Sequence, residues 1–98
     1  MANIVFLQFA VNDVEKARDW YDDKHPGLGE RFLTEVTYAV EAIEKSPKAY
    51  PLKYGPLRAK LLNKFPYCIF YRVENKNLIR IHSCLHYKQN IQSIIDLR

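Results

Sequence analysis

The strongest constraint on the fold is a pair of β-rich segments that flank a short turn. Residues 67–74 and 78–86 are rich in β-branched and aromatic side chains, and Asn75-Lys76-Asn77 between them is typical of a hairpin loop. With a three-residue loop, Glu74 faces Leu78, Val73 faces Ile79, Tyr71 faces Ile81 and Ile69 faces Ser83. The two segments therefore predict an antiparallel hairpin with one largely apolar face.

The opposite face of this hairpin carries cations. The same register places Arg72 opposite Arg80, Phe70 opposite His82 and Cys68 opposite Cys84. A shift by one residue would mix the two faces and is disfavoured. Two directly opposed arginines repel each other unless something anionic covers them. We therefore expect an anionic group on this face.

Two amphipathic helices are predicted before the hairpin. The first runs over residues 12–24, because Asn12 and Glu15 have the spacing of a capping box and Pro26 disfavours helix at the residue before it. The second runs over residues 29–45, where apolar residues recur at helical spacing: Phe32, Val36, Val40 and Ile43. The short connection between them predicts an antiparallel helical hairpin.

The remaining segments complete a single α+β domain over residues 1–98. Residues 3–9 and 57–62 are strand candidates, and residues 47–56 are a loop rich in proline. The tail, residues 88–98, is too short to hold a helix alone and needs a docking site on this chain or another. The predicted order is β-α-α-β-β-β, with the helical hairpin packed on a twisted antiparallel sheet and a short C-terminal helix.

Charge is distributed unevenly along the chain. Residues 1–46 carry nine acidic and five basic side chains, whereas residues 47–98 carry ten basic and two acidic ones. Arg58 and Lys60 share one face of their strand. Four further side chains share one face of the hairpin: Arg72, Arg80, His82 and His86. If the two faces coincide, they form a basic, partly aromatic surface for RNA or for an acidic protein segment, although a merely solvated basic surface fits as well.

Signals for chemistry at single residues are weaker. His82, Cys84 and His86 alternate along one strand, which fits either a zinc site or an ordinary half-buried sheet face. We favour the second reading and expect no metal and no cofactor. The opposed cysteines permit a disulfide, but buried reduced thiols are expected. Catalytic candidates are His86, as a general acid or base, with Lys88 and Arg58.

The sequence also predicts a cytoplasmic protein. It contains no apolar run of membrane-spanning length, and its first residues are typical of a strand and not of a secretion signal. Two cysteines are too few for a disulfide scaffold, which fits a reducing compartment.

Several motifs, taken in order, resemble the ParE/RelE toxin superfamily. They are Pro26-Gly27-Leu28-Gly29-Glu30-Arg31-Phe32 at the entry to the second helix, Ser46-Pro47 and Tyr50-Pro51 after it, Arg58 with Leu61, Phe65-Pro66-Tyr67-Cys68-Ile69-Phe70-Tyr71-Arg72-Val73, and the strand from Ile79 to His86. The resemblance covers nearly the whole chain. It implies the toxin of a bacterial type II toxin–antitoxin pair, neutralised by a partly disordered, often acidic antitoxin, as a homodimer or a toxin–antitoxin hetero-oligomer.

The resemblance allows two mechanisms. RelE-like members cut messenger RNA on the ribosome, but Cys68 stands where they usually carry an arginine and Ile94 stands near their tail tyrosine, while Lys88 keeps a cation. ParE-like members inhibit a protein, DNA gyrase, without chemistry of their own. The resemblance therefore favours a ParE-like, non-enzymatic toxin. The alternatives are an mRNA endonuclease using His86 and a non-toxic relative that only binds an antitoxin.

Overall fold

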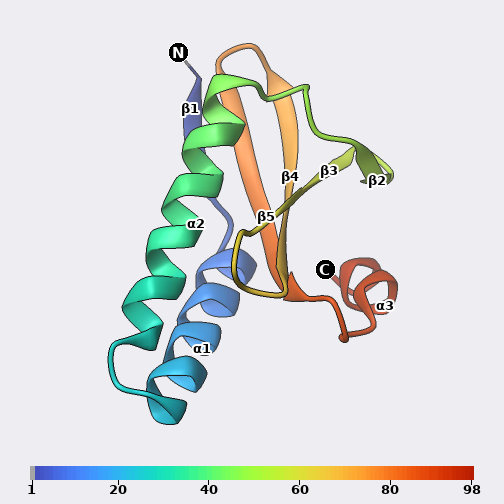
Figure 1. The fold of residues 1–98 in the computed structure, drawn as a ribbon. Coiled ribbons are helices and arrows are strands. Elements are labelled where there is room, and N and C mark those ends of the chain that lie inside the picture. Colours follow the sequence, from blue (N-terminus) through green and yellow to red (C-terminus); the bar gives the residue numbers. More distant parts are fainter. Residues whose placement is uncertain (1) are drawn as a thin grey trace.

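The computed structural model describes residues 2–98 and contains five strands and three helices. Their order is β1 (Asn3–Phe6), α1 (Gln8–Lys24), α2 (Leu28–Lys45), β2 (Leu52–Tyr54), β3 (Leu57–Leu61), β4 (Tyr67–Asn75), β5 (Leu78–His86) and α3 (Ile91–Asp96). Figure 1 shows α1 and α2 side by side on one side of the sheet and α3 on the other side. The predicted α+β fold is confirmed, and the predicted loop 47–56 contains one additional short strand, β2.

One sheet contains all five strands, in the order β1-β5-β4-β3-β2. β2, β3, β4 and β5 pair antiparallel as a meander, whereas β1 pairs parallel with β5 at one edge. The sheet is therefore mixed: four strands run antiparallel, and β5 lies beside β1 and runs in the same direction.

The N-terminal helix begins earlier than the capping pattern predicts. β1 ends at Phe6 and α1 begins at Gln8, with Leu7 in extended conformation at the cap. The Asn12 side chain accepts a hydrogen bond from Gln8 within the helix and does not cap it. The backbone N–H of Leu7 instead donates to Ile81, which ends the strand pairing and starts the helix.

The turn between α1 and α2 depends on two glycines. Gly27 has a φ of +90°, a conformation that side chains disfavour. A Cβ atom at Gly29 would lie 2.7 Å from both the Arg18 carbonyl oxygen and the Asp22 carboxyl group. The Gly29 N–H donates to Asp22 Oδ1 at 2.7 Å, so the two helices approach closely at this end.

The main core lies between the two long helices and the sheet. We call this side of the sheet the helix face. Phe32 and Ile43 of α2 pack there with Ile69 and Tyr71 of β4, and all four are almost fully buried. The Tyr71 hydroxyl reaches out of this core to donate to the Pro47 carbonyl at 2.6 Å, which ties the loop after α2 to the sheet.

The predicted hairpin register is right for three pairs in the middle of the hairpin and wrong on either side of them. Arg72 pairs with Arg80, Val73 with Ile79 and Tyr71 with Ile81, as predicted. Two irregularities change the other pairs: Asn75, not Glu74, faces Leu78, and beyond Tyr71 the partners become Phe70–Ser83, Ile69–Cys84, Cys68–Leu85 and Tyr67–His86. The second irregularity leaves His82 as an extra residue, so it is a β-bulge.

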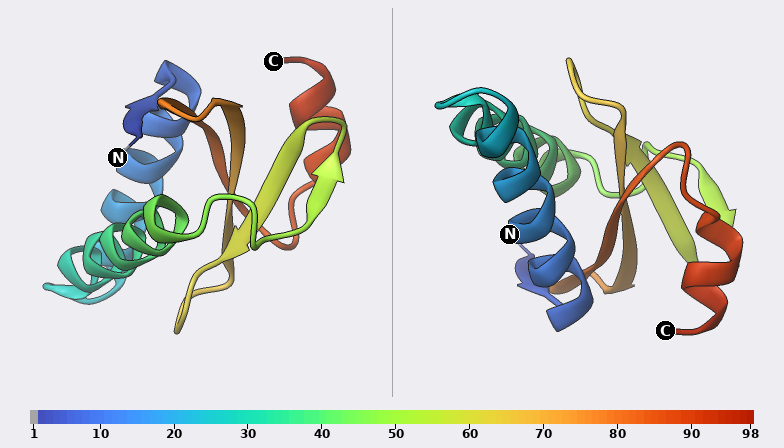
Figure 2. Two further views of the ribbon diagram at one scale, coloured as in Figure 1. Left: turned by 90° about the horizontal axis from the view of Figure 1, so that it is seen from above. Right: turned by 90° about the horizontal axis from the view of Figure 1, so that it is seen from below.

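A smaller apolar cluster covers the other side of the sheet, which we call the tail face. Ile91, Ile94 and Ile95 of α3 pack there on a buried set from three strands: Leu57, Ala59, Cys68, Phe70 and Leu85. Both views in Figure 2 show the sheet between the long helices on one side and α3 on the other. The tail thus docks on its own chain. No helix within residues 2–98 is long and apolar enough to cross a membrane.

Candidate functional site

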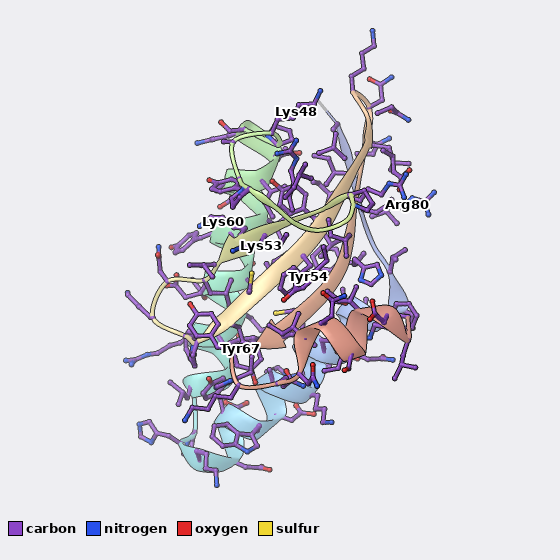
Figure 3. The ribbon with its side chains drawn as sticks, turned by 90° about the vertical axis from the view of Figure 1, so that its right-hand side faces the viewer. Lys48, Lys53, Tyr54, Lys60, Tyr67 and Arg80 are labelled. Carbon is purple, nitrogen blue, oxygen red and sulfur yellow. The ribbon has the colours of Figure 1, made fainter. Side chains whose placement is uncertain are left out.

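The predicted cations lie on two different faces of the sheet. Arg58 pairs with Tyr71 and Lys60 with Ile69, both in the core on the helix face, whereas Leu57 and Ala59 turn toward α3. Arg72 and Arg80 alternate with core residues and therefore lie on the tail face. In Figure 3, which looks onto the side of the sheet that carries α3, Lys60 lies toward one edge of the sheet and Arg80 toward the other. The predicted single basic surface is therefore wrong.

Arg58 and Lys60 support the loop that follows α2. Nη1 of Arg58 donates to the carbonyls of Lys48 at 3.2 Å and Tyr50 at 2.8 Å. Nζ of Lys60 donates to the Leu61 carbonyl at 2.9 Å and lies 5.2 Å from the centre of the Tyr50 ring. The hydrogen bonds of Arg58 hold the loop, and Lys60 contacts the loop only through the Tyr50 ring.

Arg72 and Arg80 form a charged cluster with Glu74. The Nε atoms of the two arginines lie 3.4 and 3.5 Å from the same oxygen, Oε1 of Glu74. The side chains of Arg72 and Arg80 are 52% and 46% exposed. The anion expected between the opposed arginines is thus the carboxylate of Glu74 in β4. Two arginines and one glutamate leave the cluster with one net positive charge.

His82 lies beside this cluster, at the bulge. Its Nδ1 is 2.8 Å from Ser83 Oγ, and its ring lies 5.7 Å from the ring of Phe9. Burial lowers the pKa of His82, with a further contribution from the nearby charge of Arg98. Ser83 Oγ also accepts from Arg98, so its own proton is free to donate to His82 Nδ1 in the neutral ring.

The C-terminal residue fastens the tail to the first helix. Arg98 donates to both carboxylate oxygens of Asp13, at 2.7 and 2.8 Å, and to Ser83 Oγ at 2.7 Å. Asp13 Oδ2 also accepts the backbone N–H of Cys84 at 2.9 Å, next to the bulge. The pKa of Arg98 is raised by its hydrogen bonds to Asp13. We call Asp13, Ser83 and Arg98 the tail latch.

The tail leaves only part of its face accessible. In Figure 3, α3 lies across the lower part of the tail face, while Arg80 projects beside the upper part of the sheet. The predicted surface is therefore partly covered by the chain's own carboxyl end. What stays exposed is the cluster of Arg72, Glu74 and Arg80 near the hairpin turn.

His86 does not join this cluster. Because of the bulge it pairs with Tyr67, whose side chain packs on the core of the helix face. Nδ1 of His86 accepts the backbone N–H of Lys88 at 3.0 Å. Its basic lone pair is already used, and Lys88 is exposed beyond the strand. His86 and Lys88 are neighbours, but Arg58 lies apart from them, because it pairs with Tyr71, four residues along β4 from the partner of His86.

A depression of about 530 Å³ lies beside His86, and sequence reasoning missed it. Its lining includes aromatic side chains from α1 and β4, namely Trp20, Tyr21 and Tyr67, together with Lys16. Trp20 is exposed, although its spacing from Val14 and Ala17 places it on the apolar stripe of α1.

A second depression, of about 760 Å³, lies between α2 and the turn before β4. Its lining includes Glu35, whose side chain is only 9% exposed and whose Oε2 lies 3.9 Å from Nζ of Lys64. The sequence signal for this depression was Glu35, an acidic residue three positions after Phe32 on the buried side of α2.

The cysteines and histidines do not form a metal site. Within residues 2–98, no group of three or more His, Cys, Asp or Glu side chains is placed to hold an ion. The bulge puts Cys84 in the core of the helix face and Cys68 under α3, so both are free thiols on opposite faces. Burial raises the pKa of Cys68 to about 11 and that of Cys84 further.

Residues 4–91 match the family model described as the ParE toxin of the type II toxin–antitoxin system parDE. The chain belongs to the ParE toxin family. A comparison with curated protein sequences gives no match.

Two solved structures share the ParE-like fold. The chromosomal ParDE toxin–antitoxin system from P. aeruginosa gives a TM-score of 0.66 at 21% identity, covering 88% of this chain and 96% of that one. YafQ from E. coli strain BL21(DE3) gives a TM-score of 0.60 at 12% identity, covering 89% and 94%. At these identities the two likenesses establish the fold alone. The ParE family membership confirms the predicted superfamily and implies an antitoxin partner.

Proposed function

We propose that this ParE family member is a toxin that acts by binding and inhibiting a protein target such as DNA gyrase, and that a cognate antitoxin neutralises it. The observation that carries this proposal is the separation of Arg58 from the other two candidate catalytic groups, His86 and Lys88. Arg58 holds a loop on the helix face, and His86 accepts a backbone hydrogen bond through Nδ1. A general base needs a free lone pair within reach of the proton that it removes.

The surface that favours a protein partner is the exposed cluster near the hairpin turn. Arg72 and Arg80, with His82 beside them, are the proposed partner-binding residues on the tail face. Arg58 and Lys60 are no longer proposed for this role, because they lie on the other face. The proposed action takes place in the cytoplasm, where gyrase is found.

The direct test is a supercoiling assay with purified components. Gyrase should lose supercoiling activity when micromolar amounts of this chain are added, and an added antitoxin should restore the activity. Normal supercoiling at those concentrations contradicts the gyrase proposal.

A second candidate is a ribosome-dependent mRNA endonuclease. The depression of about 530 Å³ beside His86 favours it, because the exposed ring of Trp20 and the amino group of Lys16 suit a single-stranded base and its phosphate. Transcript ends mapped after induction separate the candidates. Cleaved messages that disappear with His86→Ala would support the endonuclease, and growth arrest with intact messages would exclude it.

The third candidate is a non-toxic relative that only binds an antitoxin. Expression of this chain without any partner decides the matter, since growth arrest excludes this candidate and normal growth at high expression supports it.

A further inference from the structure

The cluster of Arg72, Glu74 and Arg80 is not a completed ion-pair network. Both arginines contact the same oxygen of Glu74, at 3.4 and 3.5 Å. Charge-assisted hydrogen bonds between nitrogen and carboxylate are shorter, about 2.7–2.9 Å. One carboxylate thus faces two half-exposed guanidinium groups loosely, and the cluster keeps a net positive charge.

An apolar depression of about 370 Å³ adjoins the three charged side chains. Apolar side chains from four parts of the chain line it: Leu7, Tyr54, Leu57 and Ile95. A cationic rim beside an apolar floor fits a carboxylate followed closely by an aliphatic side chain.

We propose that these three residues are a docking site for an acidic, partly apolar segment of a partner protein, and that Glu74 occupies the carboxylate position in the free chain. We call them the arginine clamp. A partner carboxylate displaces Glu74 and bridges both arginines, while a neighbouring aliphatic side chain enters the depression. This inference rests on the proposed function, in which the partner is the antitoxin.

The observations favour a protein segment over RNA. A phosphate backbone is followed by cations spread along its path. Arg58 and Lys60, which would extend such a path, lie on the other face of the sheet. The remaining pair suits a single carboxylate, because an arginine matches carboxylate geometry well.

The proposal makes Glu74 an internal competitor, which gives it a distinctive test. The probe is a short fluorescent peptide of alternating glutamate and leucine, with a glutamine–leucine peptide and a single-stranded RNA of equal charge as comparison ligands. Binding to the full chain is followed by anisotropy. Glu74→Gln should tighten binding of the acidic peptide about three- to tenfold, because two exposed ion pairs no longer compete. Arg72→Gln and Arg80→Gln should each weaken it by a similar factor.

Matched variants control for net charge. Glu41→Gln removes the same charge from an exposed position on α2, and Lys76→Gln removes one positive charge from the hairpin turn. Glu41→Gln should change binding less than twofold, since a screened surface charge has little effect at a distance. Lys76→Gln should change it less than Arg72→Gln or Arg80→Gln, because the ion pairs of Glu74 are with those two arginines. Three results would overturn the proposal: no binding of the acidic peptide, no tighter binding by Glu74→Gln than by Glu41→Gln, or RNA binding that exceeds peptide binding.

The clamp and the proposed function fail separately. If the chain blocks gyrase but the clamp variants bind the peptide like the wild type, only the clamp is wrong. If the clamp variants respond as expected but gyrase is unaffected, the choice of target is wrong and the clamp stands.

Discussion

The tail latch makes a quantitative prediction about stability. Arg98 and Asp13 form a bidentate ion pair, and their side chains are only 18% and 13% exposed. Arg98→Ala removes two hydrogen bonds to a carboxylate and one to Ser83. Each bond to a charged group contributes about 1.5–3 kcal/mol, but holding the arginine side chain in place costs about 1.5–2 kcal/mol. Because desolvation of the two charged groups offsets a large part of the remainder, we expect a net loss of about 2 kcal/mol in the free energy of unfolding.

Asp13→Ala should cost more, about 3 kcal/mol, because the buried N–H of Cys84 then loses its acceptor as well. The double variant should cost less than the two single changes together, with a coupling of about 1.5 kcal/mol. Urea denaturation of the four proteins measures this cycle, and a loss of about 2 kcal/mol corresponds to a melting temperature lower by about 10 °C.

The control is Gln92→Ala, which breaks an exposed hydrogen bond within α3 to Asp96 and should cost less than about 0.5 kcal/mol. If the effects of Arg98→Ala and Asp13→Ala simply add, the two side chains do not interact in solution, and the account of how the tail is held is refuted.

Three further predictions follow from single positions. Gly29→Ala should destabilise the fold by about 1–3 kcal/mol in urea denaturation, because its methyl group would lie 2.7 Å from α1; wild-type stability would show that the helices separate easily. The Cys68 thiol, whose pKa is raised to about 11, should react with a thiol reagent at pH 8 only after unfolding, and rapid labelling of the folded chain contradicts its burial. Because the folded-state pKa of His82 is lowered, the unfolded chain binds more protons, so stability should fall as the pH drops below about 6.5; His82→Gln should reduce this dependence, and an unchanged slope argues against it.

The sequence predicted the secondary structure well because its patterns are local. The stripe on α2 and the alternation along β4 and β5 are determined by which residues are apolar, and the observed bounds of α2 and β5 agree with the prediction within one residue. The start of α1 was wrong because a long-range contact, Leu7 to Ile81, outweighed the capping pattern at Asn12.

The site was predicted less well because it depends on one bulge. Because His82 is an extra residue, each later residue of β5 lies on the face opposite to the predicted one. Cys84 is therefore separated from Cys68, and His86 lies on the helix face. No pattern in β5 signals the bulge, because Asp13, which accepts the Cys84 N–H beside it, is distant in sequence. The face to which each β3 side chain points is likewise determined by the pairing of β3 with β4. Arg58 pairs with Tyr71 and therefore lies on the helix face.

We propose that this ParE family chain acts by binding a protein and not by cutting RNA. The most direct measurement is parallel sedimentation of the purified chain with gyrase and with ribosomes, each at micromolar concentration. Our account predicts that the chain sediments with gyrase and stays in the supernatant with ribosomes. Sedimentation with ribosomes, and none with gyrase, would contradict it.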